Sequence, residues 1–198
     1  MSFALCVFCG SALGTRPEYA AAARAVGTEI GRRGWTLVYG GGRVGLMGVL
    51  ADAAIAAGAS VVGVIPRFLF ELEVAHPGLN ALEVVETFAE RKQRMGELSD
   101  AFLSLPGGVG TMDELFEAWS WSHARLQDKP SGLLNTAGYY DDLVAFLDRA
   151  VTDGFVQQKS RDLLLVGNDV VGLLDAIDRC QRRVVLKIRQ SSSAPSMS

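Results

Sequence analysis

The chain has 198 residues, of which 49% are hydrophobic and 21% are charged, a composition typical of a globular domain with a sizeable core. A net charge of −3 and an isoelectric point near 5.4 argue against a protein built mainly to bind nucleic acid. No apolar run reaches the roughly 18 residues that would span a bilayer, and the start of the chain lacks the basic segment of a signal peptide. We therefore expect a cytoplasmic protein without a membrane partner, which the three cysteines also fit.

Short apolar runs alternate with helical patterns along the whole chain. The expected strands cover residues 3–10, 35–40, 60–66, 81–86, 101–106, 130–135 and 161–167. The expected helices cover residues 17–34, 44–58, 87–100, 111–125, 139–154 and 169–183. Pro17 suits the first turn of its helix and Gly34 the end, whereas Thr87 and Glu90 predict a capping box.

Nearly continuous apolar strands that alternate with helices indicate a parallel sheet covered on both faces. That architecture is a doubly wound, Rossmann-like α/β fold, here one domain over residues 1–189. Residues 190–198 are low in complexity and predict a disordered tail. Ligands of such sheets bind at the carboxyl ends of the strands, so the glycine-rich turns after Tyr39 and Leu105 are the first candidates for a site.

Cysteine chemistry is an alternative that the spacing disfavours. Cys6 and Cys9 form a C-x-x-C, but they lie in the first strand rather than at a helix N-terminus that would lower a thiol pKa. Zinc would need more ligands, and the two histidines of the chain are His76 and His123. We interpret Cys6 and Cys9 as buried thiols and expect neither a metal nor a redox role.

The first glycine-rich turn contains G-x-G-x-x-G at Gly40, Gly42 and Gly45. A dinucleotide site would need an acidic residue about 20 positions later, and the sequence SVVGVIPRF at that place has none. The Gly-Lys-Ser/Thr of a nucleoside-triphosphate loop is also missing. Two interpretations remain: a helix N-terminus that binds a phosphate, with Gly41 and Gly42 as loop candidates, or a tight turn that lets helix and strand pack closely.

The second glycine-rich turn, PGGVGTMDE, follows a strand that ends at Pro106. Its glycines, Gly107 among them, allow a positive φ or a close approach to a ligand. We expect Thr111 to begin a helix whose positive end would receive a phosphate. Glu114 then has two interpretations: it completes a T-x-x-E capping box with Thr111, or its carboxylate serves another part of the ligand.

Two basic residues, Arg91 and Lys92, lie on the helix before the strand that leads into the second turn. In one interpretation they are surface charges that pair along the helix with Glu90 or Glu97. In the other, Arg91 reaches over the strand ends toward the ligand.

These motifs resemble those of the lonely guy family, the cytokinin riboside 5′-monophosphate phosphoribohydrolases, some of which carry the name lysine decarboxylase. The family signature P-G-G-x-G-T-x-x-E fits Pro106–Glu114 at every fixed position. The second family motif, M-H-x-R-K-x-x-M, is matched at Arg91, Lys92 and Met95. The resemblance covers about residues 3–150.

The resemblance implies a hydrolase that cleaves the N-glycosidic bond of an adenosine 5′-monophosphate, often N6-prenylated. The products would be the free base and ribose 5-phosphate, formed without a metal or cofactor. It also implies a homodimer or larger assembly with the site near the subunit interface. Phe88 and Ala89 replace the usual Met-His, so the resemblance leaves the selectivity on the adenine side open.

The family's catalytic pair corresponds to Arg91 and Glu114. Its substrate contacts correspond to Glu73, Lys92, Gly108, Val109, Gly110, Thr111, Met112, Asp113 and Ser120. Glycosidic cleavage passes through an oxocarbenium-like sugar, and a carboxylate can stabilise that cation or orient the attacking water. The second turn and Thr111 would then hold the 5′-phosphate, while Glu114 addresses the ribose.

A non-catalytic nucleoside-monophosphate-binding protein of the same fold is the alternative from a different class. A nicotinamide oxidoreductase is disfavoured because the ribose-binding acid is missing. The residues do not choose between AMP and a prenylated substrate.

Overall fold

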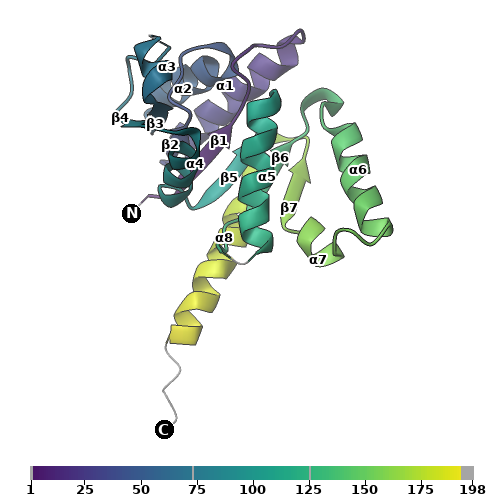
Figure 1. The fold of residues 1–198 in the computed structure, drawn as a ribbon. Helices are drawn as coiled ribbons and strands as arrows, with labels where there is room; N and C mark the ends of the chain where they lie inside the picture. The colour runs from purple at the N-terminus through teal and green to yellow at the C-terminus, as the bar shows by residue number, and fades with distance from the viewer. Residues whose placement is uncertain (1, 73, 125, 193–198) are drawn as a thin grey trace.

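The computed structural model describes residues 2–72, 74–124 and 126–192. These residues form a seven-stranded sheet in the order β4-β3-β2-β1-β5-β6-β7 (Figure 1), in which every neighbouring pair is parallel. The strands are β1 (Ala4–Phe8), β2 (Thr36–Tyr39), β3 (Ser60–Pro66), β4 (Ala81–Val85), β5 (Ala101–Ser104), β6 (Ser131–Leu134) and β7 (Leu164–Gly167). The predicted doubly wound α/β fold is confirmed.

The helices are α1 (Pro17–Arg32), α2 (Gly45–Ala56), α3 (Arg67–Glu71), α4 (Phe88–Glu97), α5 (Val109–His123), α6 (Asp141–Thr152), α7 (Gln158–Arg161) and α8 (Val170–Ser192). A single 3₁₀ turn, Thr136–Gly138, precedes α6. The short elements α3 and α7 were not expected, because five or four residues are too few to show a helical period. Helix α8 continues to Ser192, three residues into the segment expected as a tail, and residues 193–198 lie outside the described part of the chain.

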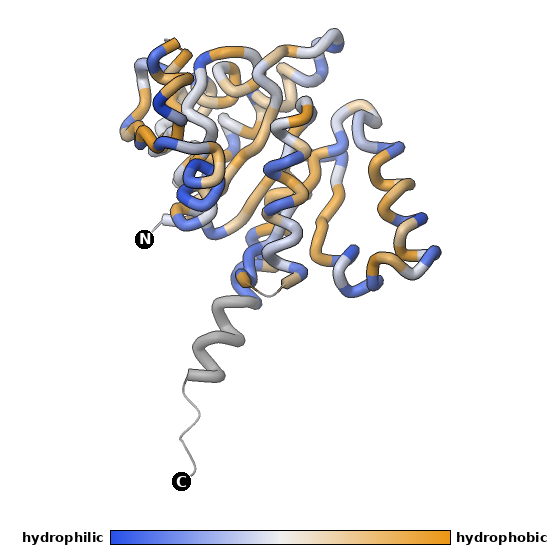
Figure 2. The backbone as a smooth tube through the Cα atoms, in the orientation of Figure 1, coloured by the Kyte–Doolittle hydropathy of each residue, from blue (hydrophilic) through white to orange (hydrophobic). Residues whose placement is uncertain are grey.

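Alternate side chains of the central strand enter two different layers, as the pleat of a strand requires. Leu5 and Val7 pack with α1, α2 and α8 on one face of the sheet, and Cys6 and Phe8 pack with α4 and α5 on the other. Figure 2 shows the resulting pattern, with apolar strands at the centre and helices of mixed hydropathy around them. A third cluster joins α5 and α6 beside β6 and β7.

The start of α4 follows the predicted cap. The Thr87 hydroxyl accepts a hydrogen bond from the Glu90 amide at 3.1 Å, and the Glu90 carboxylate accepts one from the Glu86 amide at 2.9 Å. In a standard capping box the Glu90 carboxylate would accept from the amide of the cap residue, Thr87. Here it accepts from the amide of the preceding residue, Glu86. This double anchorage sets where α4 begins, and with it the position of Arg91 in its first turn.

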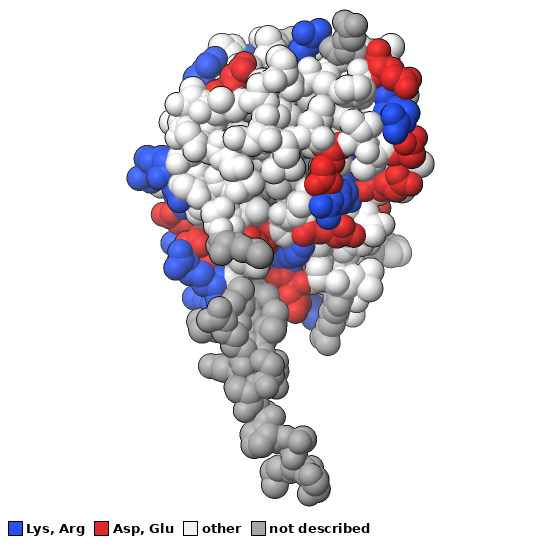
Figure 3. Space-filling model, turned by 90° about the vertical axis from the view of Figure 1, so that its left-hand side faces the viewer, with Lys and Arg blue, Asp and Glu red and all other residues white. Residues whose placement is uncertain are grey.

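The side of the molecule that carries α3 and β4 has a broad area without charged side chains (Figure 3). On α3, Phe68 and Phe70 are each 45% exposed, and Leu72 just beyond it is 67% exposed. Within the described ranges, no helix is both long and apolar enough to cross a bilayer.

Candidate active site

Three turns meet at the carboxyl edge of the sheet, because β2, β1 and β5 are neighbours. The amide of Gly10, after β1, donates to the carbonyl of Pro106, after β5, at 3.1 Å. The carbonyl of Gly10 in turn accepts a hydrogen bond from the amide of Leu46 in α2 at 3.0 Å. The turn after β1 thus ties the start of α2 to the second glycine-rich turn.

Helix α5 begins at Val109, so the expectation that Thr111 begins it is wrong. Gly108 is the N-cap, and no side chain caps the helix. Thr111, 3% exposed, is the third helical residue, and Glu114 lies beyond the first turn. The capping-box interpretation of Glu114 therefore fails. The amides of the first helical turn have no partner within the helix, and this end carries the positive pole of the helix dipole.

Arg91 is held from three sides at the start of α4. Its Nε donates to the carbonyl of Val64 at the end of β3 at 3.1 Å, and its guanidinium lies 6.0 Å from the Phe88 ring centroid. Gly40 supplies the room, because a methyl group at that position would overlap the guanidinium. The first glycine-rich turn therefore serves the arginine as well as the ligand cavity.

A buried ion pair joins α4 to α5. Arg91 Nη1 lies 3.4 Å from Glu114 Oε1, and the two side chains are only 11% and 10% exposed. Burial raises the pKa of Glu114 to about 7, against the opposing attraction of Arg91. A carboxyl with a pKa near neutrality, beside a fixed cation in a cavity, is typical of a functional site.

The pair faces a cavity of about 340 Å³. Its polar and backbone lining comes from three turns and two helices, and its apolar lining comes from α2, β3, α3 and the segment that precedes β4. The lining residues are Cys9, Gly10, Ser11, Gly40, Gly42, Val44, Met47, Ile65, Leu69, Val74, Arg91, Gly108, Val109, Gly110, Thr111 and Glu114. The arrangement places free helix amides, a carboxylate, a guanidinium and an apolar wall around one cavity, whose volume suits a small molecule.

Lys92 and Asp113, both expected at the substrate, bind each other instead of lining the cavity. Lys92 Nζ lies 2.9 Å from Asp113 Oδ2 and 2.7 Å from Glu117 Oε2. Burial would lower the pKa of Lys92, but the attraction of Glu117 and Asp113 prevails and raises the pKa. These contacts run beside the Arg91–Glu114 pair and fasten the same two helices.

Other expected site residues also lie outside the cavity lining. Gly41 has φ +74° and packs against Ile65. Gly107 packs against Thr111, and Met112 joins the cluster under α6. Ser120 lines a separate groove with His123 and two phenylalanines. Glu73 lies outside the described residues.

Cys9 and Ser11 were missed as lining residues, although their position after the first strand was a usable signal. Parallel strands end at one edge, so the turn C-G-S had to lie beside the two glycine-rich turns. Burial, followed by the charge of Glu114, raises the pKa of the Cys9 thiol well above its ordinary range, in keeping with an unreactive buried thiol. Among the described residues, no three His, Cys, Asp or Glu side chains gather as a metal site.

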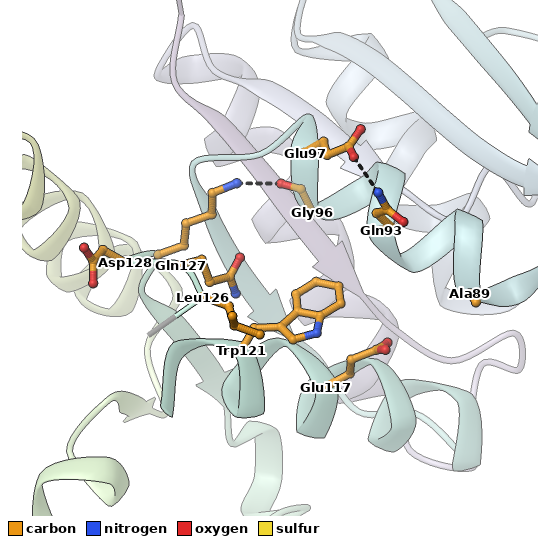
Figure 4. Close-up of a pocket in the computed structure, with 10 residues that line it drawn as sticks. Ala89, Gln93, Gly96, Glu97, Glu117, Trp121, Leu126, Gln127 and Asp128 are labelled. Carbon is orange, nitrogen blue, oxygen red and sulfur yellow. Dashed lines mark hydrogen bonds between the residues drawn. The ribbon is translucent and has the colours of Figure 1, made fainter. Parts of the chain in front are cut away.

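A larger hollow of about 670 Å³ lies on the outer side of α4 and α5 (Figure 4). Trp121 and Glu117 of α5 face Gln93 of α4 across it. Lys129 donates to the carbonyl of Gly96 at 2.6 Å, and burial lowers the pKa of its ammonium. The hollow contains neither the ion pair nor the free helix amides, so the smaller cavity is the better candidate for the reaction.

Known structures support the fold. The molybdenum cofactor binding protein of Rippkaea orientalis superposes with a TM-score of 0.70 at 20% identity, covering 90% of this chain and 97% of that one. The molybdenum cofactor carrier protein of Chlamydomonas reinhardtii gives a TM-score of 0.69 at 21% identity, covering 91% and 98%.

Sequence relatives identify the family. The family model described as "Possible lysine decarboxylase" matches residues 47–177. A cytokinin riboside 5′-monophosphate phosphoribohydrolase of Rhodococcoides fascians is 46% identical over 172 residues, 86% of this chain and 87% of the relative. A probable enzyme of the same name from Oryza sativa subsp. japonica is 42% identical over 178 residues, 90% of this chain and 80% of the relative. The resemblance carried by the two motifs is therefore confirmed, and the chain belongs to the lonely guy family, the one described as possible lysine decarboxylases.

Proposed function

We propose that this protein hydrolyses the N-glycosidic bond of an adenosine 5′-monophosphate, with or without an N6-prenyl group, to the free base and ribose 5-phosphate. The observation that carries the proposal is the buried Arg91–Glu114 pair, at 3.4 Å, in one cavity with the free amides of α5. The names of the relatives support the same reaction.

The phosphate belongs at the start of α5. The amides of Val109, Gly110 and Thr111 are the unpartnered donors of the first turn, and the helix dipole adds attraction for an anion. Glu114 follows Thr111 by three residues, or about 4.5 Å along the helix axis. That offset separates the carboxylate from the phosphate and brings it to the ribose.

Glu114 acts on the sugar in this proposal. The bond to the base breaks through an oxocarbenium-like state, and the ionised carboxylate stabilises that cation or orients the attacking water. Arg91 holds Glu114 from the opposite helix and adds a fixed positive charge near the departing base. The carbonyl of Val64 keeps the guanidinium in place, so little reorganisation accompanies the reaction.

The base belongs on the apolar side of the cavity, among Met47, Ile65, Leu69 and Val74. Phe88, half exposed and packed edge-on against Phe68, lies beside Arg91 on the same helix. An apolar wall accommodates a prenyl group on the base as well as a bare adenine.

The proposed enzyme is cytoplasmic and works as a homodimer in which the outer faces of α4 and α5 meet those of a second copy. The large hollow between these helices is left open in a single chain (Figure 4). At its margin Leu126 is 76% exposed, and Phe88 on α4 is 50% exposed. Two-fold dimers are the commonest assemblies of chains of this kind.

The reaction should depend on the 5′-phosphate. Incubation with AMP or isopentenyladenosine monophosphate should release free base, whereas adenosine should react on the order of 100-fold more slowly, because it lacks the charge-assisted bonds of the phosphate. Chromatography of the free base measures both rates. Equal turnover of AMP and adenosine would contradict the proposal that the start of α5 binds the 5′-phosphate. Binding of AMP without release of base would favour a non-catalytic nucleotide-binding protein.

Glu114→Gln should abolish most turnover while binding survives. The amide keeps the size of the side chain but cannot stabilise a cation, so kcat for AMP should fall about 100-fold or more. AMP affinity should change little, because the α5 amides are untouched. Glu97→Gln, an exposed carboxylate on α4, is the matched control and should retain full activity. A folded Glu114→Gln protein that cleaves AMP at the wild-type rate would contradict the assignment.

The pH dependence of the activity should follow the ionisation of Glu114. Because burial raises its pKa to about 7, the carboxylate is populated only as pH rises through 7. We expect kcat/KM for AMP to rise up to tenfold per pH unit below that value and to level off above it. The residual activity of Glu114→Gln should lack this step. A step that persists in the variant belongs to another group, such as the substrate phosphate with its second pKa near 6.

Light scattering should give a mass of about twice the 21.2 kDa chain at micromolar concentration. Leu126→Glu should shift the protein toward monomers, because a charge would be buried at the proposed contact. Phe146→Glu is the matched control, since Phe146 is 63% exposed on α6, away from this face. A wild-type mass near one chain would refute the dimer.

A further inference from the structure

Three successive carbonyls, at and just before the start of the second glycine-rich turn, accept hydrogen bonds from groups outside the turn. The hydroxyl of Tyr140 donates to the carbonyl of Leu105 at 2.6 Å, and the amide of Gly10 donates to that of Pro106 at 3.1 Å. The hydroxyl of Tyr139 donates to that of Gly107 at 2.6 Å. The turn is thus fixed one peptide plane after another, and two of the three donors come from one distant segment.

The segment that carries the tyrosines is itself rigidly built. Ala137 has φ +55°, the one positive φ of a non-glycine residue in the described ranges. Such a backbone is strained and persists only where its surroundings determine it. Here Asn135 accepts from the Tyr140 amide and donates to Asp141, each at 2.7 Å, and Arg16 donates to the Ala137 carbonyl at 3.2 Å.

The bond to Gly107 has a directional consequence. The described chain contains no cis peptide bond, and in a planar trans peptide the carbonyl and the next amide point in opposite directions. A Gly107 carbonyl held by Tyr139 therefore turns the amide of Gly108 away from Tyr139. Gly108 lines the 340 Å³ cavity, and Tyr139 does not. The amide immediately before the free amides of α5 thus points away from Tyr139 and belongs to a residue that lines the cavity.

The bond also stands out because Tyr139 is not a core residue. Tyr139 is 43% exposed, and its neighbour Tyr140 supplies the buried contact of this segment. Tyr139 lies in a smaller hollow on the far side of the same turn, shared with Gly107, Gly108 and Tyr19. An exposed side chain that bonds only a binding turn acts on the turn rather than on the core.

We propose that Tyr139 is a positioning residue for the phosphate-binding turn, and that its hydroxyl aims the Gly108 amide at the phosphate monoester of the substrate. The proposal rests on the proposed function, because it takes the anion in the cavity to be the 5′-phosphate. Tyr139 itself touches neither the base nor the ribose. Loss of its hydroxyl weakens phosphate-ester binding and leaves the chemical step and the base contacts intact.

The test compares Tyr139→Phe with Tyr19→Phe. Tyr19 packs edge-on against Tyr139 with ring centroids 5.5 Å apart, so the control removes a hydroxyl from the same cluster and keeps the bond to Gly107. For both variants and the wild type, the measurements are kcat and KM for AMP, the dissociation constants of ribose 5-phosphate and adenine, and the melting temperature. The loss of one hydrogen bond predicts about a three- to tenfold rise in KM and in the ribose 5-phosphate constant for Tyr139→Phe. Its kcat, adenine constant and melting temperature should match those of the control.

Unchanged ribose 5-phosphate binding in Tyr139→Phe would overturn the proposal, as would an equal loss of adenine binding, which indicates a general disturbance. The proposed function fails separately: a wild-type protein that binds ribose 5-phosphate but releases no base from AMP is not the proposed hydrolase. In that case the ratio of the ribose 5-phosphate dissociation constants of Tyr139→Phe and the wild type still tests the role of Tyr139. A wild-type protein that binds neither AMP nor ribose 5-phosphate would overturn both.

Discussion

The buried ion pair between Arg91 and Glu114 is the constraint around which this end of the molecule is organised. The attraction between two buried charges offsets the free-energy cost of removing them from water only when their geometry is good and further hydrogen bonds are made. The Val64 carbonyl supplies such a bond to the arginine, and Lys92, paired with Asp113 and Glu117, fastens the same two helices one residue along. Burial nevertheless raises the pKa of Glu114 to about 7, so the attraction of Arg91 does not fully offset the cost of burying this carboxyl.

The glycines of the site have different roles, and each role follows from the groups that pack against that glycine. Gly40 leaves room for the guanidinium of Arg91, and Gly45, with φ +59°, lets the turn after β1 approach the start of α2. Gly108 has open space around its α-carbon and therefore remains accessible to a ligand. The two glycine-rich turns thus serve packing, arginine placement and ligand access at different positions.

Most of the fold could be predicted from the sequence, and so could the choice of Arg91 and Glu114 as candidates, because strand–helix alternation and the two motifs are local signals. The start of α5 was misplaced because Thr111 looks like a cap, whereas the helix begins at a glycine with no capping side chain. Lys92 and Ser120 were assigned to the substrate by resemblance, but their side chains follow the geometry of α4 and α5 and leave the cavity. The roles of Gly40 and Tyr139 depend on contacts across 51 and 32 positions of the chain, which no local pattern reveals.

In the proposed mechanism, anion binding depends on backbone groups and bond cleavage on side chains. The amides proposed to bind the phosphate are backbone groups at the start of α5, whereas the ion pair is made by side chains of α4 and α5. Substitution of a single side chain on those helices can therefore silence the reaction without dismantling the nucleotide site. A descendant without this glutamate would still bind nucleoside monophosphates. An enzyme of this architecture would then become a sensor once part of its surface responded to the bound nucleotide.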